Sequence, residues 1–288
     1  MLIAHESPLS IIDDISKITS FDYCLVHLCE THPKYYSFFK QSLLQGREVL
    51  LDNSIFELGH AFDSIKFAQY VEDLKPTYYI VPDVLENSTA TMSSFRKFKL
   101  QYPNLPGLTI GVVQGKTYQE LVECYKYMSD HADYIAISFD YSWYSTIGNY
   151  ESIVRPTTIM DAEDSAVFEE LYQRDKHRMS LELLADGRRK FINMLIDDGI
   201  WNHSKPHHLL GNSLPQEMKH YKGIKSIRSV DTSNPVVAGI KGIRYIKDYG
   251  MTQKPKTLLA DLIDYDVHDE QKADILYNTQ QFKTFCNE

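Results

Sequence analysis

Short apolar runs recur along the chain, separated by longer stretches in which apolar residues repeat at helical spacing. Runs of this kind that end in a polar residue, a glycine or a break are typical of buried strands. The pattern predicts seven strands, at residues 23–28, 48–52, 78–83, 108–115, 133–138, 207–211 and 226–231. We place an eighth near residues 236–238 and treat Leu2–Ala4 only as a short apolar start.

Helical patterns lie between these runs. Ser88 is a candidate N-cap, and Thr117 and Glu120 have the spacing of a capping box. Residues 139–180 lack a clear period and are rich in tyrosine, so we expect a long loop with a short helix there. The predicted helices cover residues 35–44, 64–74, 88–100, 117–128, 180–198, 214–221 and, as one helix or two, 261–285.

Strands and helices that alternate at roughly 25–30-residue spacing are the signature of parallel β-α-β units. The chain contains neither G-x-G-x-x-G nor G-x-x-x-x-G-K-[ST], the usual nucleotide-binding motifs of open sheets. We therefore expect an α/β fold, a closed TIM-type (β/α)8 barrel formed by a single domain over residues 1–288. Two additions are expected, an insertion or lid at 139–180 and a C-terminal helical segment at 258–288.

The composition is that of an ordinary globular protein of 288 residues, 43% hydrophobic and 24% charged. No apolar run reaches the roughly 18 residues of a membrane span, and the start has no signal-peptide pattern. We therefore expect a soluble, cytoplasmic protein without a membrane partner. The four cysteines form no C-x-x-C pair, which argues against a zinc ribbon or a disulfide framework. We expect neither a metal nor a cofactor.

Charge is unevenly distributed along the chain. The net charge is −9, yet residues 186–256 hold 13 Lys/Arg against six Asp/Glu. A basic segment in an otherwise acidic chain suggests a surface that meets a polyanion; the alternative is a set of solvated, lysine-rich helix faces. The candidate nucleic-acid contacts are Arg188, Arg189, Lys190, Arg228, Arg244, Lys254 and Lys256.

Four predicted strands end in polar side chains, Asp52, Asp83, Gln114 and Asp231. In a (β/α)8 barrel such strand ends meet at one rim, where active sites form. Two carboxylates there can act as nucleophile and general acid/base, and Phe56 in the loop after Asp52 offers a ring for stacking on a planar ligand. Taken singly, each has a structural alternative: the aspartates cap turns or helices, and the phenylalanine belongs to the core.

These residues resemble motifs of the tRNA-guanine transglycosylase superfamily. Asp-Asn-Ser-Ile-Phe-Glu at 52–57 stands where that family has aspartate, a small residue, two glycines, an aromatic residue and glutamine. Ile-Gly-Val-Val-Gln-Gly at 110–115 is similar to its Gly-Ile-Val-Gln-Gly-Gly strand, and His-Leu-Leu-Gly at 208–211 to its Tyr-Leu-Met-Gly strand. Val-Asp at 230–231 then matches the nucleophile strand in order and spacing. The resemblance covers roughly residues 48–240.

The resemblance implies a base exchange through a covalent glycosyl-enzyme. Asp231 would attack C1′ of a guanosine, and Asp52 would move a proton on or off the base, as a retaining double displacement requires. Phe56 would stack on the base, Asp83 and Gln114 would read its edge, and Gly211 would leave room for it. The substrate-binding residues implied are Asn53, Phe56, Asp83, Gln114, Gly115 and Gly211.

The chain also departs from the family pattern. Ser54-Ile55 replace the paired glycines, Glu57 replaces the glutamine, and Ser138-Phe139 lie where the family has a glycine-rich strand end. The zinc motif C-x-C-x-x-C is absent. Zinc-free relatives include the bacteriophage-type DNA-guanine transglycosylases, which this chain resembles most. That implies DNA as partner, a 7-deazaguanine such as queuine or a precursor as second substrate, and DNA modification that evades restriction in a host cytoplasm.

Other interpretations stay open. The target could be tRNA rather than DNA, the released sugar could pass to water as in an N-glycosidase, or the barrel could bind nucleic acid without catalysis. A metal site is a further alternative, with His207-His208 and the nearby His5 and His27 as ligands, although adjacent strand residues point to opposite faces. A homodimer is compatible with the sequence, which does not specify the oligomeric state.

Overall fold

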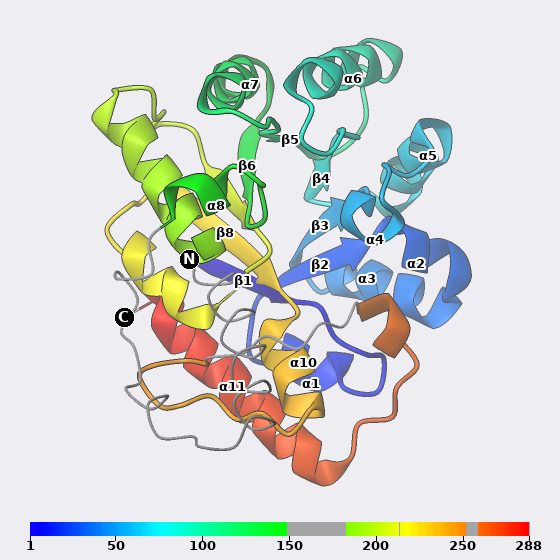
Figure 1. Cartoon of the computed structure of the whole chain (residues 1–288). Helices are drawn as coiled ribbons and strands as arrows, with labels where there is room; N and C mark the ends of the chain where they lie inside the picture. The colour runs from blue at the N-terminus through cyan, green and yellow to red at the C-terminus, as the bar shows by residue number, and fades with distance from the viewer. Residues whose placement is uncertain (149–182, 213, 252–258, 288) are drawn as a thin grey trace, which may run out of the picture.

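The computed structural model describes residues 1–148, 183–212, 214–251 and 259–287. Eight parallel strands form a nearly closed barrel in the order β1-β8-β7-β6-β5-β4-β3-β2, which confirms the predicted TIM-type α/β fold (Figure 1). The strands are β1 (Leu2–His5), β2 (Phe21–Leu25), β3 (Glu48–Asp52), β4 (Tyr78–Ile80), β5 (Leu108–Val112), β6 (Tyr134–Ser138), β7 (His207–Leu210) and β8 (Ile227–Thr232).

Helices surround the strands, as Figure 1 shows for α5, α6 and α7 on one side and α10 and α11 on the other. A helix over residues 183–197 follows the segment outside the described residues. The other α-helices are α1 (Ile12–Ser16), α2 (Val26–Thr31), α3 (Pro33–Leu44), α4 (Ile55–Leu58), α5 (Ser64–Leu74), α6 (Ser88–Gln101), α7 (Tyr118–His131), α8 (Tyr144–Ile147), α10 (Asn234–Ile240) and α11 (Asp269–Asn287). The 3₁₀ helices are η2 (Pro215–Tyr221) and η3 (Leu259–Leu262).

The eighth strand is not where the sequence pattern placed it. Leu2–His5, treated above as a mere apolar start, is β1 and pairs with β8, whereas residues 236–238 lie inside α10. Pro235 occupies the first turn of that helix, where backbone N–H groups have no partner within the helix, so its missing N–H costs no hydrogen bond. Every residue of α10 is buried, so its apolar run shows no helical period and is indistinguishable from a strand by pattern.

The N-terminal caps of α6 and α7 mark where the loops after β4 and β5 end and the helices begin. Thr117 accepts a hydrogen bond from the N–H of Glu120 and caps α7, as the capping-box spacing predicts. The cap of α6 is Asn87 rather than Ser88, because its side chain accepts from the N–H of Ala90. These loops follow the carboxyl ends of the strands and therefore build that rim of the barrel.

The two predicted additions are seen only in part. The first residues of the expected lid, 139–148, include α8, and residues 149–182 lie outside the described part of the chain. The C-terminal helical segment contains η3 and α11, and α11 packs on α10 and η2. Within the described ranges, no helix is long and apolar enough to cross a membrane.

Candidate active site

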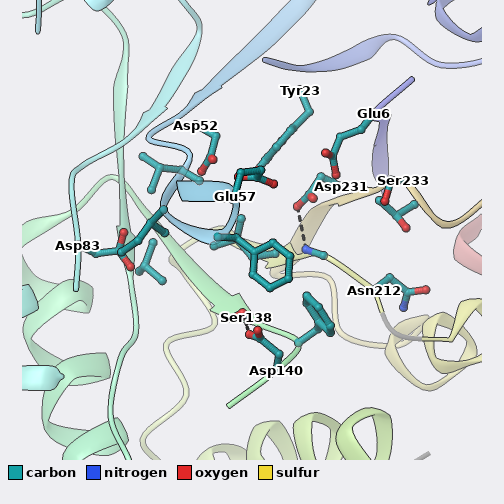
Figure 2. A pocket seen from close by; sticks show the side chains of 18 of the residues that line it. Glu6, Tyr23, Asp52, Glu57, Asp83, Ser138, Asp140, Asn212, Asp231 and Ser233 are labelled. Atoms are coloured by element: carbon teal, nitrogen blue, oxygen red, sulfur yellow. Dashed lines mark hydrogen bonds between the residues drawn. The ribbon is translucent and has the colours of Figure 1, made fainter. Parts of the chain in front are cut away.

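A pocket of about 840 Å³, its open mouth included, lies at the carboxyl rim of the barrel. Figure 2 shows side chains from several strand ends and loops pointing into it. Its lining consists of Glu6, Tyr23, Asp52, Ile55, Phe56, Glu57, Ile80, Asp83, Leu85, Val112, Gln114, Ser138, Phe139, Asp140, Leu210, Gly211, Asn212, Asp231, Thr232 and Ser233.

The pocket is acidic. Six of its lining residues carry carboxyl groups, and among the described residues that line it there is no Lys, Arg or His. Figure 2 shows Asp52, Glu57 and Asp231 facing a common space, with Glu6 beside Asp231. Several carboxylates so close together repel one another, which favours protonation of some of them. The site can therefore hold both an ionised and a protonated carboxyl group at once.

Asp231 is held by one of its two oxygens. Its Oδ1 accepts a hydrogen bond of 2.9 Å from His208 Nε2 and one of 3.0 Å from the N–H of Gly211. The side chain is 4% exposed, and the described residues give Oδ2 no hydrogen bond. Accepting two N–H groups suits an ionised carboxylate, so Oδ2 is left with its lone pairs directed at the pocket.

Asp52 lies across the pocket at the end of β3. Its Oδ2 accepts from the N–H of Ser54 at 2.7 Å, and Ser54 adopts the left-handed conformation, with φ 59°. This conformation strains a residue with a β-carbon by about 1–2 kcal/mol, whereas glycine adopts it freely. The turn after Asp52 is therefore kept in a glycine-like shape although its residues are Ser54 and Ile55.

Burial raises the pKa of two neighbouring carboxyl groups. The pKa of Asp52 lies well above its usual value because the group is desolvated, and the nearby Glu57 charge adds to the effect. Desolvation likewise raises the pKa of Glu57 to about 7, with Asp231 contributing by charge repulsion. Both shifts favour the protonated form, so either carboxyl group is suited to hold a proton and pass it on.

Asp83 is fixed by two side-chain amides. Asn53 Nδ2 donates to its Oδ1 at 2.8 Å, and Gln114 Nε2 donates to its Oδ2 at 2.7 Å. The amide oxygens are also engaged, since Asn53 Oδ1 accepts from the N–H of Ile55 and Gln114 Oε1 from the N–H of Glu86. Both amides thus orient the carboxylate of Asp83, which lines the pocket as an acceptor.

Two aromatic rings and a glycine shape the wall near Asp231. Phe56 is 49% exposed, and its ring centroid lies 5.8 Å from that of Phe139. Gly211 has φ +64°, and a β-carbon there would lie 2.5 Å from Phe139 Cδ1. The exposed Phe56 ring is free to stack on a flat ligand, and Gly211 keeps Phe139 in place beside it.

Six of the eight sequence-predicted catalytic and substrate-binding residues line this pocket; the two that do not are Asn53 and Gly115. Asn53 is fully buried and acts on the pocket through Asp83. A β-carbon at Gly115 would lie 2.8 Å from Glu120 Cβ, so this glycine lets the strand end pack against α7. The six that line the pocket are Asp52, Phe56, Asp83, Gln114, Gly211 and Asp231.

The prediction that Arg188 contacts nucleic acid is wrong for this structure. Arg188 is fully buried and forms a two-pronged ion pair with Glu217, at 2.7 and 3.1 Å. Its Nη1 also donates to the carbonyl oxygens of Leu210 and Gly211. Arg188 therefore supports the strand end that forms the pocket wall, and counting charges along the sequence could not reveal this burial.

The other basic candidates do not gather at the rim. Arg189 and Lys190 both pair with the buried Asp186 and keep only part of their surface exposed. Arg228 is the second residue of β8 and lines a shallow depression with Lys205 at the opposite, amino end of the barrel. Arg244 lies over the ring of Tyr277 and near Asp274. The remaining candidates, Lys254 and Lys256, lie outside the described residues.

Sequence reasoning considered His208 only as a metal ligand and missed its contact with Asp231. His207 faces the helix layer and stacks on Trp201 and Tyr125, whereas His208 points into the barrel, as the alternation of strand residues predicts. Across the described ranges, no three His, Cys, Asp or Glu side chains are grouped to hold a metal ion. Glu6 and Glu57 were also missed as pocket residues, although Glu57 lies within the motif at 52–57.

The comparisons with known proteins find no match for this chain, either among the models of protein families or among the curated proteins.

Proposed function

We propose that this protein is a base-exchange transglycosylase that replaces guanine in DNA with a 7-deazaguanine. The observation that carries the proposal is the pair of carboxyl groups on one pocket. Asp231 is held through Oδ1 and receives no hydrogen bond at Oδ2 from the described residues, and Asp52 has a buried carboxyl group with a raised pKa. A retaining exchange at a sugar carbon needs such a nucleophile and such an acid.

The reaction follows from these two groups. Asp231 Oδ2 forms a bond to C1′ while the bond from C1′ to N9 of guanine breaks, and the electron pair leaves with the base. The protonated Asp52 supplies the proton that the leaving guanine takes up. The incoming base then gives a proton to Asp52 and attacks C1′, and the bond to Asp231 breaks to restore the carboxylate. No cofactor is consumed.

The pocket's surroundings support a flipped base as substrate. The target nucleotide must leave the duplex to reach a pocket at the barrel rim, and Phe56 offers it a ring to stack on. The carboxylate of Asp83, fixed by Gln114, is placed to accept N–H groups from a guanine edge. DNA is favoured over tRNA only by the resemblance to zinc-free relatives.

The test is an exchange assay with radiolabelled guanine on DNA and tRNA in parallel. We expect label in DNA with the wild-type chain and none with Asp231→Ala, whose nucleic-acid binding should survive. Asp133→Asn, which changes a carboxylate at the amino end of β6, is the matched control and should exchange normally. Label in tRNA alone would redirect the proposal to tRNA, release of free guanine without label uptake would indicate an N-glycosidase, and normal exchange by Asp231→Ala would refute the nucleophile.

A further inference from the structure

A distortion between β7 and β8 brings a histidine and a serine into line with Asp231. The pairing register shifts between His207, which faces Ile227, and His208, which faces Ser229. β8 therefore has one extra residue at this point, Arg228. Bulges of this kind redirect side chains and are frequent beside active sites. Here the shift places His208 beside both Ser229 and Asp231.

Both nitrogens of the His208 ring are occupied. Nδ1 lies 2.8 Å from Ser229 Oγ, and Nε2 lies 2.9 Å from Asp231 Oδ1. The ring is fully buried, with Tyr23 stacked at 6.4 Å between centroids and Phe21 edge-on at 6.2 Å. Packing on two sides and hydrogen bonds at both nitrogens leave the ring a single orientation.

The chemistry of the partners defines the protons. An ionised carboxylate only accepts hydrogen bonds, so Nε2 must carry the hydrogen that points at Asp231. In the neutral ring Nδ1 then accepts from the Ser229 hydroxyl, which selects this tautomer. Ser229 is thus the outer hydrogen-bond partner that sets the tautomer of His208, and His208 in turn acts on Asp231.

We propose that His208, with its tautomer set by Ser229, is the positioning residue of Asp231. It directs Oδ2 at the substrate and, with the N–H of Gly211, stabilises the charge that returns to Oδ1. This inference rests on the proposed role of Asp231 as nucleophile and goes beyond it, since it assigns the residue that governs how easily the covalent intermediate forms and breaks.

The two donors matter most in the second step. When the bond between C1′ and Oδ2 breaks, its electron pair returns to the carboxylate and spreads over both oxygens. Fixed N–H groups aimed at an oxygen that gains charge lower the barrier, and loss of one such donor typically slows turnover about 10²–10³-fold. A chain without the His208 donor should therefore accumulate the glycosyl-enzyme.

The variant that tests this is His208→Phe, with exchange rates and covalent adduct measured together. We expect kcat to fall about 100-fold, the KM for the nucleic acid to fall with it because the second step is slowed, and adduct to accumulate on a denaturing gel. His208→Gln, which restores an N–H near the position of Nε2, should recover much of the rate. Ser229→Ala should give an intermediate loss, because the ring is then free to place its proton on Nδ1.

The matched control is His207→Phe, which makes the same replacement one residue earlier on the opposite face of β7, at an equally buried site. Any loss caused by general damage to the strand should appear in both variants. Three outcomes would each overturn the inference. They are equal kcat losses in His207→Phe and His208→Phe, no rescue by His208→Gln, and an unchanged KM and kcat in His208→Phe.

A measurement independent of activity separates this inference from the proposed function. Nitrogen-15 NMR of the wild-type chain, with the His208 signal assigned by its absence in His208→Phe, should show the proton on Nε2. A proton on Nδ1 would overturn the positioning role even if exchange is observed. A wild-type chain inactive on DNA and tRNA would remove the proposed function and this role with it, and the NMR result would then describe only a structural hydrogen bond.

Discussion

Gln114 and Asp83 are joined by a hydrogen bond of 2.7 Å from the amide Nε2 to the carboxylate Oδ2. Both side chains are buried, and the second end of the amide is held by the N–H of Glu86. Gln114 is thus a support for Asp83. The guanine edge is expected to meet the carboxylate first.

Replacing Gln114 by Leu should therefore weaken the site through Asp83. We expect the free energy of unfolding to fall by about 1–3 kcal/mol, because a buried carboxylate loses a donor. The pKa of Asp83, already raised by burial, should rise further, since this hydrogen bond lowers it. Urea denaturation measures the free energy of unfolding. Titration calorimetry with guanine at several pH values reports the change in the pKa of Asp83. Gln101→Leu, on the exposed end of α6, is the control and should change neither quantity.

Gly211→Ala should impair base binding by steric clash. The new β-carbon would lie 2.5 Å from Phe139 Cδ1, so this ring would have to leave its place in the pocket wall. Gly199 has a similar φ, +67°, but open space around it, so Gly199→Ala carries the same backbone strain of about 1–2 kcal/mol without the clash.

We therefore expect both alanine variants to lose stability, Gly211→Ala more because of the added clash, and only Gly211→Ala to lose affinity for guanine, as measured by calorimetry. Gly211→Ala combined with Phe139→Ala should bind guanine better than Gly211→Ala alone. Equal affinities for Gly199→Ala and Gly211→Ala would show that Gly211 does not shape the base site.

Glu57 should make stability depend on pH. Its pKa rises from 4.5 to about 7 in the folded chain, because burial disfavours its charge. A group with a raised folded-state pKa stabilises the fold fully below its unfolded pKa, and this contribution is lost as pH rises through the folded pKa. Between pH 4.5 and about 7 the loss should amount to about 1–3 kcal/mol.

Glu57→Gln removes this titration and should flatten the stability profile over the same window, leaving the variant more stable than the wild type above pH 7. Denaturant unfolding at closely spaced pH values measures it. Glu123→Gln, at an exposed position on α7, should follow the wild-type profile. A steeper profile for Glu57→Gln would contradict the raised pKa.

Arg188→Met should destabilise the barrel rather than weaken contact with nucleic acid. The substitution leaves Glu217 buried without its cation, and breaking a buried ion pair from one side costs about 3–5 kcal/mol. Replacing both Arg188 and Glu217 by Met should recover most of that loss. Salt-dependent DNA binding, measured on folded protein, should be the same for Arg188→Met as for the wild type.

The sequence predicts the barrel because seven of its strands have unmistakable apolar runs. It fails at β1, since four residues at the start of the chain are too few to show a pattern, and at α10, since a helix buried on all sides looks like a strand. Both errors concern elements whose identity is decided by packing between distant parts of the chain, which no local pattern records.

The candidate site follows the same logic. Strand-end residues such as Asp52 and Asp231 are predictable because parallel strands end at one rim. His208 is not, because its contact with Asp231 depends on a register shift between two strands. The basic segment misleads for a related reason: Arg188 contributes to a charge count in the same way whether it is solvated or, as here, buried on Glu217.

The barrel is closed by ladders at every junction except one. Among the described strands, β1 pairs with β8 and β2 with β3, and no ladder joins β1 to β2. Backbone amides along that seam should exchange hydrogen with solvent sooner than those of β5 and β6. Glu6, which follows β1, and Tyr23, in β2, line the pocket from the two sides of this seam. Opening of the wall at this seam would break no strand pairing, which would make it the easiest place for the pocket to widen around the proposed base.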